Sequence, residues 1–449
     1  MMMRPSTIRG LALGLCLLVT ATPAWAGPRI EQIKTPLGIS VWLVREPAIP
    51  MLALQAAWRG GSSSEPAGQE GLATLAMGLL DEGAGSLDAD AFKTALQEKA
   101  IDIDFGTDRD YTTVSLRTLS QHRERAFELL KLAMTAPRFD DEPVARVKAQ
   151  ARVAYERGRQ NPNVLAGERF AQLAYGDHAY GRRSSASTES LERINKPQLA
   201  DFTHKLLARS NLVIGAVGDI PAADLARLVD ASFGSLPADP QIALPPPVVP
   251  KTAAAPVVIP FPNPQSIVIF GAPGIAREDA DWYAATVLNQ VIGGGGMASR
   301  LFEEVREKRG LVYSVGTQLS PYKATSLVSG SLATSNAQVG DALKLVRAEL
   351  ARVAKDGVTD AELAAAKSYM TGSFPLRLSS NAAIAGMLVA MQNTGLQPDY
   401  IDAYPGLINI VTQDDIRRVA QRLFAREDYL TVVVGQPAGL DAPQQKNGG

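Results

Sequence analysis

The sequence predicts an α+β protein made of two homologous domains, each an antiparallel sheet packed with long helices. Strand-like segments occur in groups and are followed by long helical patterns, which favours helices packed on antiparallel sheets. The two halves of the 449-residue chain repeat the same order of elements. A proline-rich segment separates them and predicts a linker between two domains.

Each half is expected to open with strands and to close with a helix and an apolar strand. Residues 39–44 and 52–58 predict strands early in the first half, as does the alternating pattern of residues 111–116. The closing segments 199–218 and 416–435 align at an offset of 217 residues. A repeat of this length indicates a duplicated domain rather than a solenoid unit.

The proline-rich linker is predicted to span residues 237–264, which hold ten of the 29 prolines. Proline fixes φ and has no N–H donor, so this stretch reads as an extended connector and not as a helix or central strand. We therefore expect domains at residues 27–236 and 265–449.

The N-terminal residues 1–26 are typical of a cleaved secretory signal peptide. Arg4 and Arg9 precede a short apolar core, and a small-x-small pattern ends at Ala26. The apolar run is too short to cross a membrane, and no later segment is long and apolar enough to do so. The only cysteine, Cys16, would leave with this segment.

Composition excludes several classes of function. The formal net charge of −1 gives no positive electrostatic potential to attract nucleic acid, so nucleic acid is not expected as a main partner. One cysteine cannot build a disulfide framework or a cysteine metal cluster, and three histidines leave little material for a zinc site. His122, His178 and His204 are far apart in sequence and read as surface or hydrogen-bonding residues.

Phosphate-binding and calcium motifs are incomplete. The glycine run at 293–296 is followed by Met297, so a Walker-type loop lacks its lysine. An acidic cluster between residues 102 and 110 lacks the spacing and closing Glu of an EF-hand. We interpret it as a solvated strand-and-turn edge; its members are Asp102, Asp104, Asp108 and Asp110.

Three motifs are distinctive: GGSSSE at 60–65 with GLATLAMGLL at 71–80, GDHAYG at 176–181, and the glycine run followed by SRLFEEVREKRGLVYSV at 299–315. Together with the duplicated halves they resemble the pitrilysin/insulinase-type zinc metallopeptidases. The similarity is greatest to the short bacterial branch related to the mitochondrial processing peptidase. The resemblance implies half of a clam-like chamber and, with the signal peptide, a periplasmic location.

The zinc motif of that family is missing. Catalytic members carry His-x-x-Glu-His on the first helix, with two ligands at i and i+4 and a general base between them. The matching positions are Thr74, Met77 and Gly78, and the third-ligand position falls near Ala154, two residues from Glu156. The apolar face of this helix persists, although Gly78 would cost about 1 kcal/mol in a helix interior. We expect this chain to bind no zinc.

The motif formed by the glycine run and residues 299–315 is intact. Arg306 and Tyr313 match the Arg/Tyr pair that the family places opposite the zinc site of the other half or subunit. A tyrosine hydroxyl can stabilise an oxyanion, and an arginine can hold a substrate carbonyl. We expect a helix over 299–309 that Gly310 ends, followed by a strand that carries Tyr313.

The resemblance implies a non-zinc subunit of a heterodimeric zinc metalloendopeptidase that degrades unfolded peptides. A homologous partner with an intact His-x-x-Glu-His motif would hold the zinc, and this chain would supply Arg306 and Tyr313. An alternative is a catalytically inert peptide-binding or scaffold subunit. An independent peptidase with an unusual site is disfavoured, because the metal ligands are missing.

Overall fold

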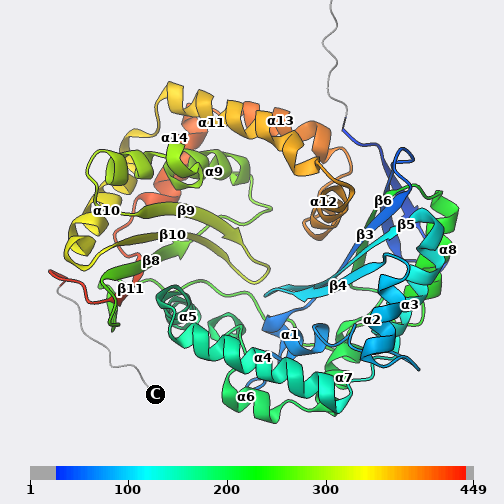
Figure 1. Ribbon diagram of the computed structural model, residues 1–449. Helices are drawn as coiled ribbons and strands as arrows, with labels where there is room; N and C mark the ends of the chain where they lie inside the picture. The colour runs from blue at the N-terminus through cyan, green and yellow to red at the C-terminus, as the bar shows by residue number, and fades with distance from the viewer. Residues whose placement is uncertain (1–26, 441–449) are drawn as a thin grey trace, which may run out of the picture.

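The computed structural model describes residues 27–440; the predicted signal peptide and Cys16 lie outside the described residues. Two separate β-sheets, each covered by helices, form an α+β architecture (Figure 1). This arrangement confirms the predicted fold class. In residues 27–440 no single helix is both long and apolar enough to cross a membrane. The consecutive helical segments Asp360–Leu378 and Asn381–Asn393 meet the two criteria only when taken together, and the chain bends by 114° between them.

The N-terminal sheet has six strands in the order β1-β2-β6-β3-β5-β4. All its neighbouring strands pair antiparallel except β2 and β6, which pair parallel. β6 enters after a long helical excursion, and such a crossover permits parallel pairing. The strands are β1 (Ile30–Lys34), β2 (Ser40–Arg45), β3 (Met51–Arg59), β4 (Asp102–Thr107), β5 (Tyr111–Leu119) and β6 (Leu212–Gly218).

The helices of the N-terminal half, apart from α5, surround a core that includes Leu43, Trp58 and Phe127. The helices are α1 (Leu72–Met77), α2 (Ala89–Gln97), α3 (Arg123–Thr135), α4 (Asp141–Arg159), α5 (Pro162–Tyr175), α6 (Thr188–Arg193), α7 (Lys196–Leu206) and α8 (Ala222–Phe233). Short 3₁₀ turns are η1 (Ser62–Ser64), η2 (Ser120–His122) and η3 (Ala179–Gly181).

The C-terminal sheet repeats the topology with the order β7-β11-β8-β10-β9, including one parallel pair, β7 with β11. Its strands are β7 (Val257–Pro260), β8 (Gln265–Pro273), β9 (Ser314–Pro321), β10 (Ser326–Ser335) and β11 (Leu430–Gly435). β7 falls inside the predicted linker, so the extended connector ends earlier than expected. Its flanking prolines are tolerated because β7 lies at the sheet edge.

The C-terminal helices follow the same plan. They are α9 (Trp282–Asn289), α10 (Val339–Asp356), α11 (Asp360–Ser373), α12 (Asn381–Asn393), α13 (Tyr400–Asn409) and α14 (Gln413–Phe424). Between them lie the π-helical segments η4 (Gln290–Gly294) and η6 (Phe302–Glu307), and the 3₁₀ turns η5 (Gly296–Ala298), η7 (Asn336–Gln338) and η8 (Phe374–Leu378). The closing helices α7 and α14 both begin with a capping box, at Asn195 and Thr412.

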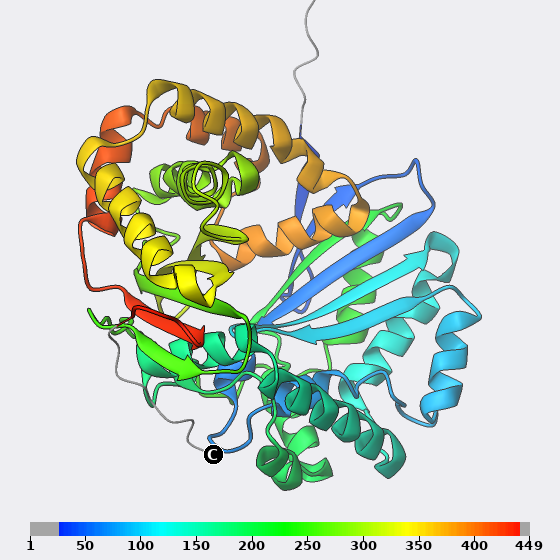
Figure 2. The ribbon, with the colours of Figure 1, turned by 60° about the vertical axis from the view of Figure 1, so that its left-hand side comes forward.

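The two halves exchange one helix each. α5 of the first half packs on β8 and β11, whereas α12 of the second half packs on β3 and β6 (Figures 1 and 2). Glycine permits both close approaches: a Cβ at Gly215 would lie 2.5 Å from the Ala385 carbonyl oxygen, and one at Gly271 would lie 2.7 Å from the Phe170 ring. The matching exchange supports duplication of one ancestral unit.

Candidate functional site

α1 carries the positions of the missing zinc motif and remains a well-packed helix. Its apolar residues Leu72, Leu75 and Ala76 are buried in the N-terminal core. The Glu65 carboxylate accepts hydrogen bonds from the Gly71 N–H at 3.1 Å and the Ala73 N–H at 2.8 Å. These bonds satisfy donors at the helix N-terminus that lack intrahelical partners.

Burial raises the pKa of Glu65 to about 8, and the two backbone donors act in the opposite direction. Only 3% of the residue is exposed. The motif that contains Glu65 was noted in the sequence, but its role as a cap depends on a loop that folds back onto α1. Glu65 therefore acts in the structure of α1, away from solvent.

The residues at the zinc positions do not fit a zinc ion. Thr74 and Gly78 are exposed, whereas Met77 is only 1% exposed and lies in the core. Zinc is held by Cys, His, Asp or Glu, and a general base must reach water. The side chain at the base position is apolar and turned into the protein. These positions therefore offer neither a zinc donor set nor a base.

Gly78 does not lie in a helix interior. α1 ends at Met77, and Gly78 is its C-cap residue, with its N–H donating to the Thr74 carbonyl at 3.0 Å. The expected interior penalty of about 1 kcal/mol does not apply at a helix end, where glycine is well tolerated. That expectation was wrong because the helix is shorter than its apolar pattern.

Ala154 lies on α4 with its methyl group exposed, and Glu156 is also exposed. A methyl group provides no metal donor. Among residues 27–440, no group of three or more His, Cys, Asp or Glu side chains is placed to hold a metal ion. The three histidines lie on separate elements, and His178 accepts a hydrogen bond from the Tyr180 N–H at Nδ1 and contacts the Pro246 carbonyl at Nε2.

Arg306 lies in the π-helix η6 rather than in the α-helix expected over 299–309. π-Helical segments are rare and frequently occur at functional sites. The Arg306 guanidinium is 4.7 Å from the centre of the Phe302 ring. Within residues 27–440 its side chain has no hydrogen-bond or ion-pair partner. The guanidinium is therefore free to meet another molecule.

Charged contacts fix the segment around Arg306. Arg300 is 8% exposed; it forms a two-pronged ion pair with Glu362 and donates to the Gly357 carbonyl at 3.4 Å. Glu304 accepts hydrogen bonds from Lys308 and Arg309, which lower the pKa of its carboxyl to about 2. These pairs tie the segment to α11 and to its own C-terminal turn.

Tyr313 immediately precedes β9, and its N–H continues the sheet by donating to the Ala333 carbonyl at 2.8 Å. Gly310 ends the preceding turn with φ +61°, as predicted. The Tyr313 side chain is 58% exposed. Arg306 and the residue after Tyr313 lie on the consecutive elements η6 and β9 of the C-terminal half, whereas α1 belongs to the N-terminal half.

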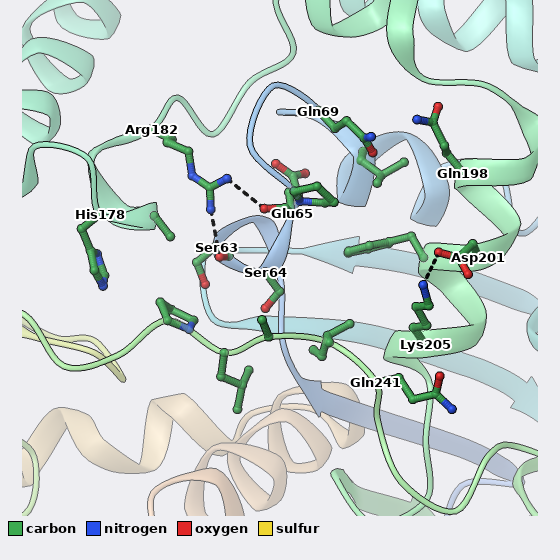
Figure 3. Close-up of a pocket in the computed structure, with 18 of the residues that line it drawn as sticks. Ser63, Ser64, Glu65, Gln69, His178, Arg182, Gln198, Asp201, Lys205 and Gln241 are labelled. Atoms are coloured by element: carbon green, nitrogen blue, oxygen red, sulfur yellow. Dashed lines mark hydrogen bonds and ion pairs between the residues drawn. The ribbon is translucent and has the colours of Figure 1, made fainter.

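A pocket of about 720 Å³ lies beside the first turn of α1, and the start of the linker forms one of its walls (Figure 3). Three of its charged side chains already have protein partners: Arg182 donates to the carbonyls of Ser63 and Glu65, and Lys205 pairs with Asp201. This pocket was not foreseen from the sequence because its walls come from distant segments. Arg182, Asp201 and Lys205 therefore stabilise the fold at this pocket.

The acidic cluster is only partly solvated, so the interpretation as a solvated edge is wrong for one member. Asp102 and Asp104 are exposed on β4, but Asp110 is 8% exposed. Its carboxylate accepts hydrogen bonds from the Tyr180 hydroxyl and the Lys323 N–H, at 3.0 Å for the latter. The partners of Asp110 are 70 and 213 residues away, so local patterning cannot reveal them.

Comparison with known proteins agrees with this architecture. Residues 53–186 match the family described as insulinase (peptidase family M16), and residues 193–370 match the peptidase M16 inactive domain. A crystal structure of a peptidase M16 inactive domain from Pseudomonas fluorescens is 31% identical, with a TM-score of 0.85 over 93% of this chain and 100% of that chain. The fold and motifs thus define a two-domain protein of the metallopeptidase class.

The chain belongs to the peptidase M16, or insulinase, family. A non-peptidase homolog YmxG from Helicobacter pylori is 27% identical, with 82% of this chain and 84% of the relative aligned. An uncharacterized zinc protease from Streptomyces coelicolor is 29% identical, with 83% and 82% aligned. With the M16 inactive domain of the Pseudomonas structure, these comparisons support an inactive, non-peptidase member of the family.

Proposed function

We propose that this chain is the non-zinc subunit of a heterodimeric, periplasmic zinc metalloendopeptidase that degrades unfolded peptides. One observation carries the proposal: the zinc positions lack ligands, whereas Arg306 and Tyr313 are exposed. A homologous subunit with an intact His-x-x-Glu-His motif would hold the zinc. The periplasmic location rests on the predicted signal peptide at residues 1–26.

The two exposed groups have complementary chemistry toward a peptide. The Tyr313 hydroxyl would donate a hydrogen bond to the oxyanion that forms on the scissile carbonyl. The Arg306 guanidinium would hold a neighbouring backbone carbonyl and keep the peptide in register. Both side chains are exposed to solvent in this chain. Their electrostatic stabilisation of the reacting peptide would be stronger in the enclosed, low-dielectric site that a partner would create.

Unfolded peptides suit the open edges of the two sheets. β4 and β9 are edge strands of their sheets. An added strand is held by main-chain hydrogen bonds, which give affinity with little demand on sequence. The proposed substrates are therefore peptides that can become extended, and folded proteins are excluded from this mode of binding.

The test is reconstitution of the purified chain with a homologous subunit that carries the intact motif. The chain alone should bind no stoichiometric zinc by mass spectrometry of metals and should cleave no peptide, whereas the mixture should cleave. Tyr313→Phe should lower kcat at least 100-fold, about 2.7 kcal/mol, while the matched control Tyr369→Phe, at another exposed tyrosine, should retain activity. Zinc-dependent cleavage by the chain alone would refute the proposal.

The alternative is an inert peptide-binding or scaffold subunit, and the name of the non-peptidase relative favours it. A scaffold has no need for the Arg306 and Tyr313 side chains. If a complex that carries both Arg306→Ala and Tyr313→Phe cleaved at the wild-type rate, the scaffold function would replace the catalytic one.

A further inference from the structure

The tips of two equivalent hairpins meet between the halves of the molecule. The β4–β5 turn contributes Asp110, and the β9–β10 turn contributes Lys323 and Ala324. Tyr180, from η3, lies between them and is completely buried. We call these four residues the clasp.

The Tyr180 hydroxyl bridges the two turns. It donates a hydrogen bond to the Asp110 carboxylate and accepts one from the Ala324 N–H at 3.1 Å. The second carboxylate oxygen of Asp110 accepts from the Lys323 N–H at 3.0 Å. Burial, and then the hydrogen bond to Asp110, raises the pKa of Tyr180 above its ordinary value. The phenol therefore keeps the proton that this bridge requires.

Surrounding groups reinforce the clasp. Arg109 donates to the Tyr180 carbonyl at 2.7 Å, and its guanidinium lies 4.8 Å from the Tyr180 ring centre and 5.5 Å from that of Tyr322. The Lys323 ammonium donates at 2.8 Å to the carbonyl of Asn393, at the end of α12. The junction is therefore polar and directional, and its central residues Tyr180, Asp110 and Ala324 are buried.

The clasp lies at one end of the strand that follows Tyr313. β9 begins one residue after Tyr313 and runs for eight residues, about 26 Å, before the turn that the clasp holds. On the N-terminal side, the clasped turn directly follows the edge strand β4. One buried junction thus sets how the two free strand edges lie relative to each other.

We propose that Asp110 and Tyr180 are positioning residues that hold the β9–β10 hairpin, and with it Tyr313, at a fixed place relative to the β4 edge. The catalytic part of this inference rests on the proposed function; the mechanical part does not. Loss of the bridge should loosen the β9–β10 turn first. The hydroxyl of Tyr313 would then occupy its productive position for a smaller fraction of the time.

Hydrogen exchange on the isolated full chain tests the mechanical part. Tyr180→Phe keeps the ring but removes the bridge, so the Lys323 and Ala324 amides should exchange about tenfold faster or more. Tyr322→Phe is the matched control: it alters a hydroxyl on a neighbouring ring and should leave both amides unchanged. Asp110→Asn removes the charge but keeps an acceptor, and should have a smaller effect than Asp110→Ala. Equal exchange in Tyr180→Phe and the control would overturn the clasp.

Steady-state kinetics of the reconstituted complex test the positioning part. Tyr180→Phe should lower kcat about tenfold with KM nearly unchanged, because peptide binding is retained and only the placement of Tyr313 suffers. Faster exchange with a wild-type kcat would overturn the positioning role. A wild-type complex that cleaves nothing would refute the proposed function, and hydrogen exchange would still decide the clasp.

Discussion

Gly215 on β6 lies where α12 crosses the N-terminal sheet, and adding one methyl group there should force the helix away. A Cβ at this position would be 2.5 Å from the Ala385 carbonyl oxygen and 2.8 Å from the Leu388 Cβ. Both obstacles belong to the helix framework and cannot rotate aside. We expect Gly215→Ala to destabilise the protein by about 2–3 kcal/mol, within the range for overpacked cores.

Gly386, on α12 itself, provides the matched control. A Cβ at Gly386 would meet nothing within 4 Å, and alanine is favoured over glycine in a helix interior by about 0.5–1 kcal/mol. Gly386→Ala should therefore stabilise the protein slightly. The same chemical change near the same helix is thus expected to have opposite signs at the two positions.

Urea unfolding followed by tryptophan fluorescence measures both effects, and Trp42 lies in the core shared by the N-terminal sheet and α12. The Gly215→Ala midpoint should fall and the Gly386→Ala midpoint should rise, with similar slopes. The reasoning fails if Gly215→Ala unfolds at the wild-type midpoint. A fall for both variants would mean that α12 tolerates no change at all, contrary to the open space around Gly386.

Three further predictions concern stability. Arg300→Ala should cost about 2–4 kcal/mol in urea unfolding, because it removes the buried guanidinium that forms an ion pair with Glu362. Arg417→Ala, which breaks an exposed ion pair with Asp414, should cost about 1 kcal/mol or less. Equal costs would contradict the role of burial. Met77→Ala should cost about 2–4 kcal/mol by leaving a cavity in the core, and a neutral result would mean that its side chain is not packed there. The folded-state pKa of Glu65, about 8, exceeds its ordinary value of 4.5, so its contribution to stability is fully present below pH 4.5 and is lost as pH rises through 8. Between pH 5 and 9 the Tm of the wild type should therefore fall more than that of Glu65→Gln, and parallel curves would argue against a raised pKa.

The sequence predicted the features that depend on near neighbours. Alternation over residues 111–116 lies within β5, whose residues alternate between partly exposed and buried positions. The aligned closing segments became β6 and β11, each after a capped helix. Gly310 ended its turn with a positive φ. Each of these structures is determined by residues that lie close together in the sequence.

Features set by distant residues were missed. The exchange of α5 and α12 cannot be read from periodicity, because an apolar helix face does not reveal which sheet it covers. The π-helix around Arg306 was expected to be α-helical, and its long-range ties, such as Arg300 with Glu362, give no local signal. Among the candidate site residues, the exposure of Arg306 and Tyr313 and the burial of Met77 became known only from the structure.

The exchanged helices also bear on how such a molecule arose. If one half is taken alone, its exchanged helix has no sheet to cover, and the apolar face of its own sheet stays bare. Two copies related by a twofold axis would repair both defects at once, since each copy would lend its helix to the other. The single chain preserves the packing of a symmetric dimer whose two subunits have been joined end to end. Joining two such copies in one chain would produce the exchange of α5 and α12 that this structure contains.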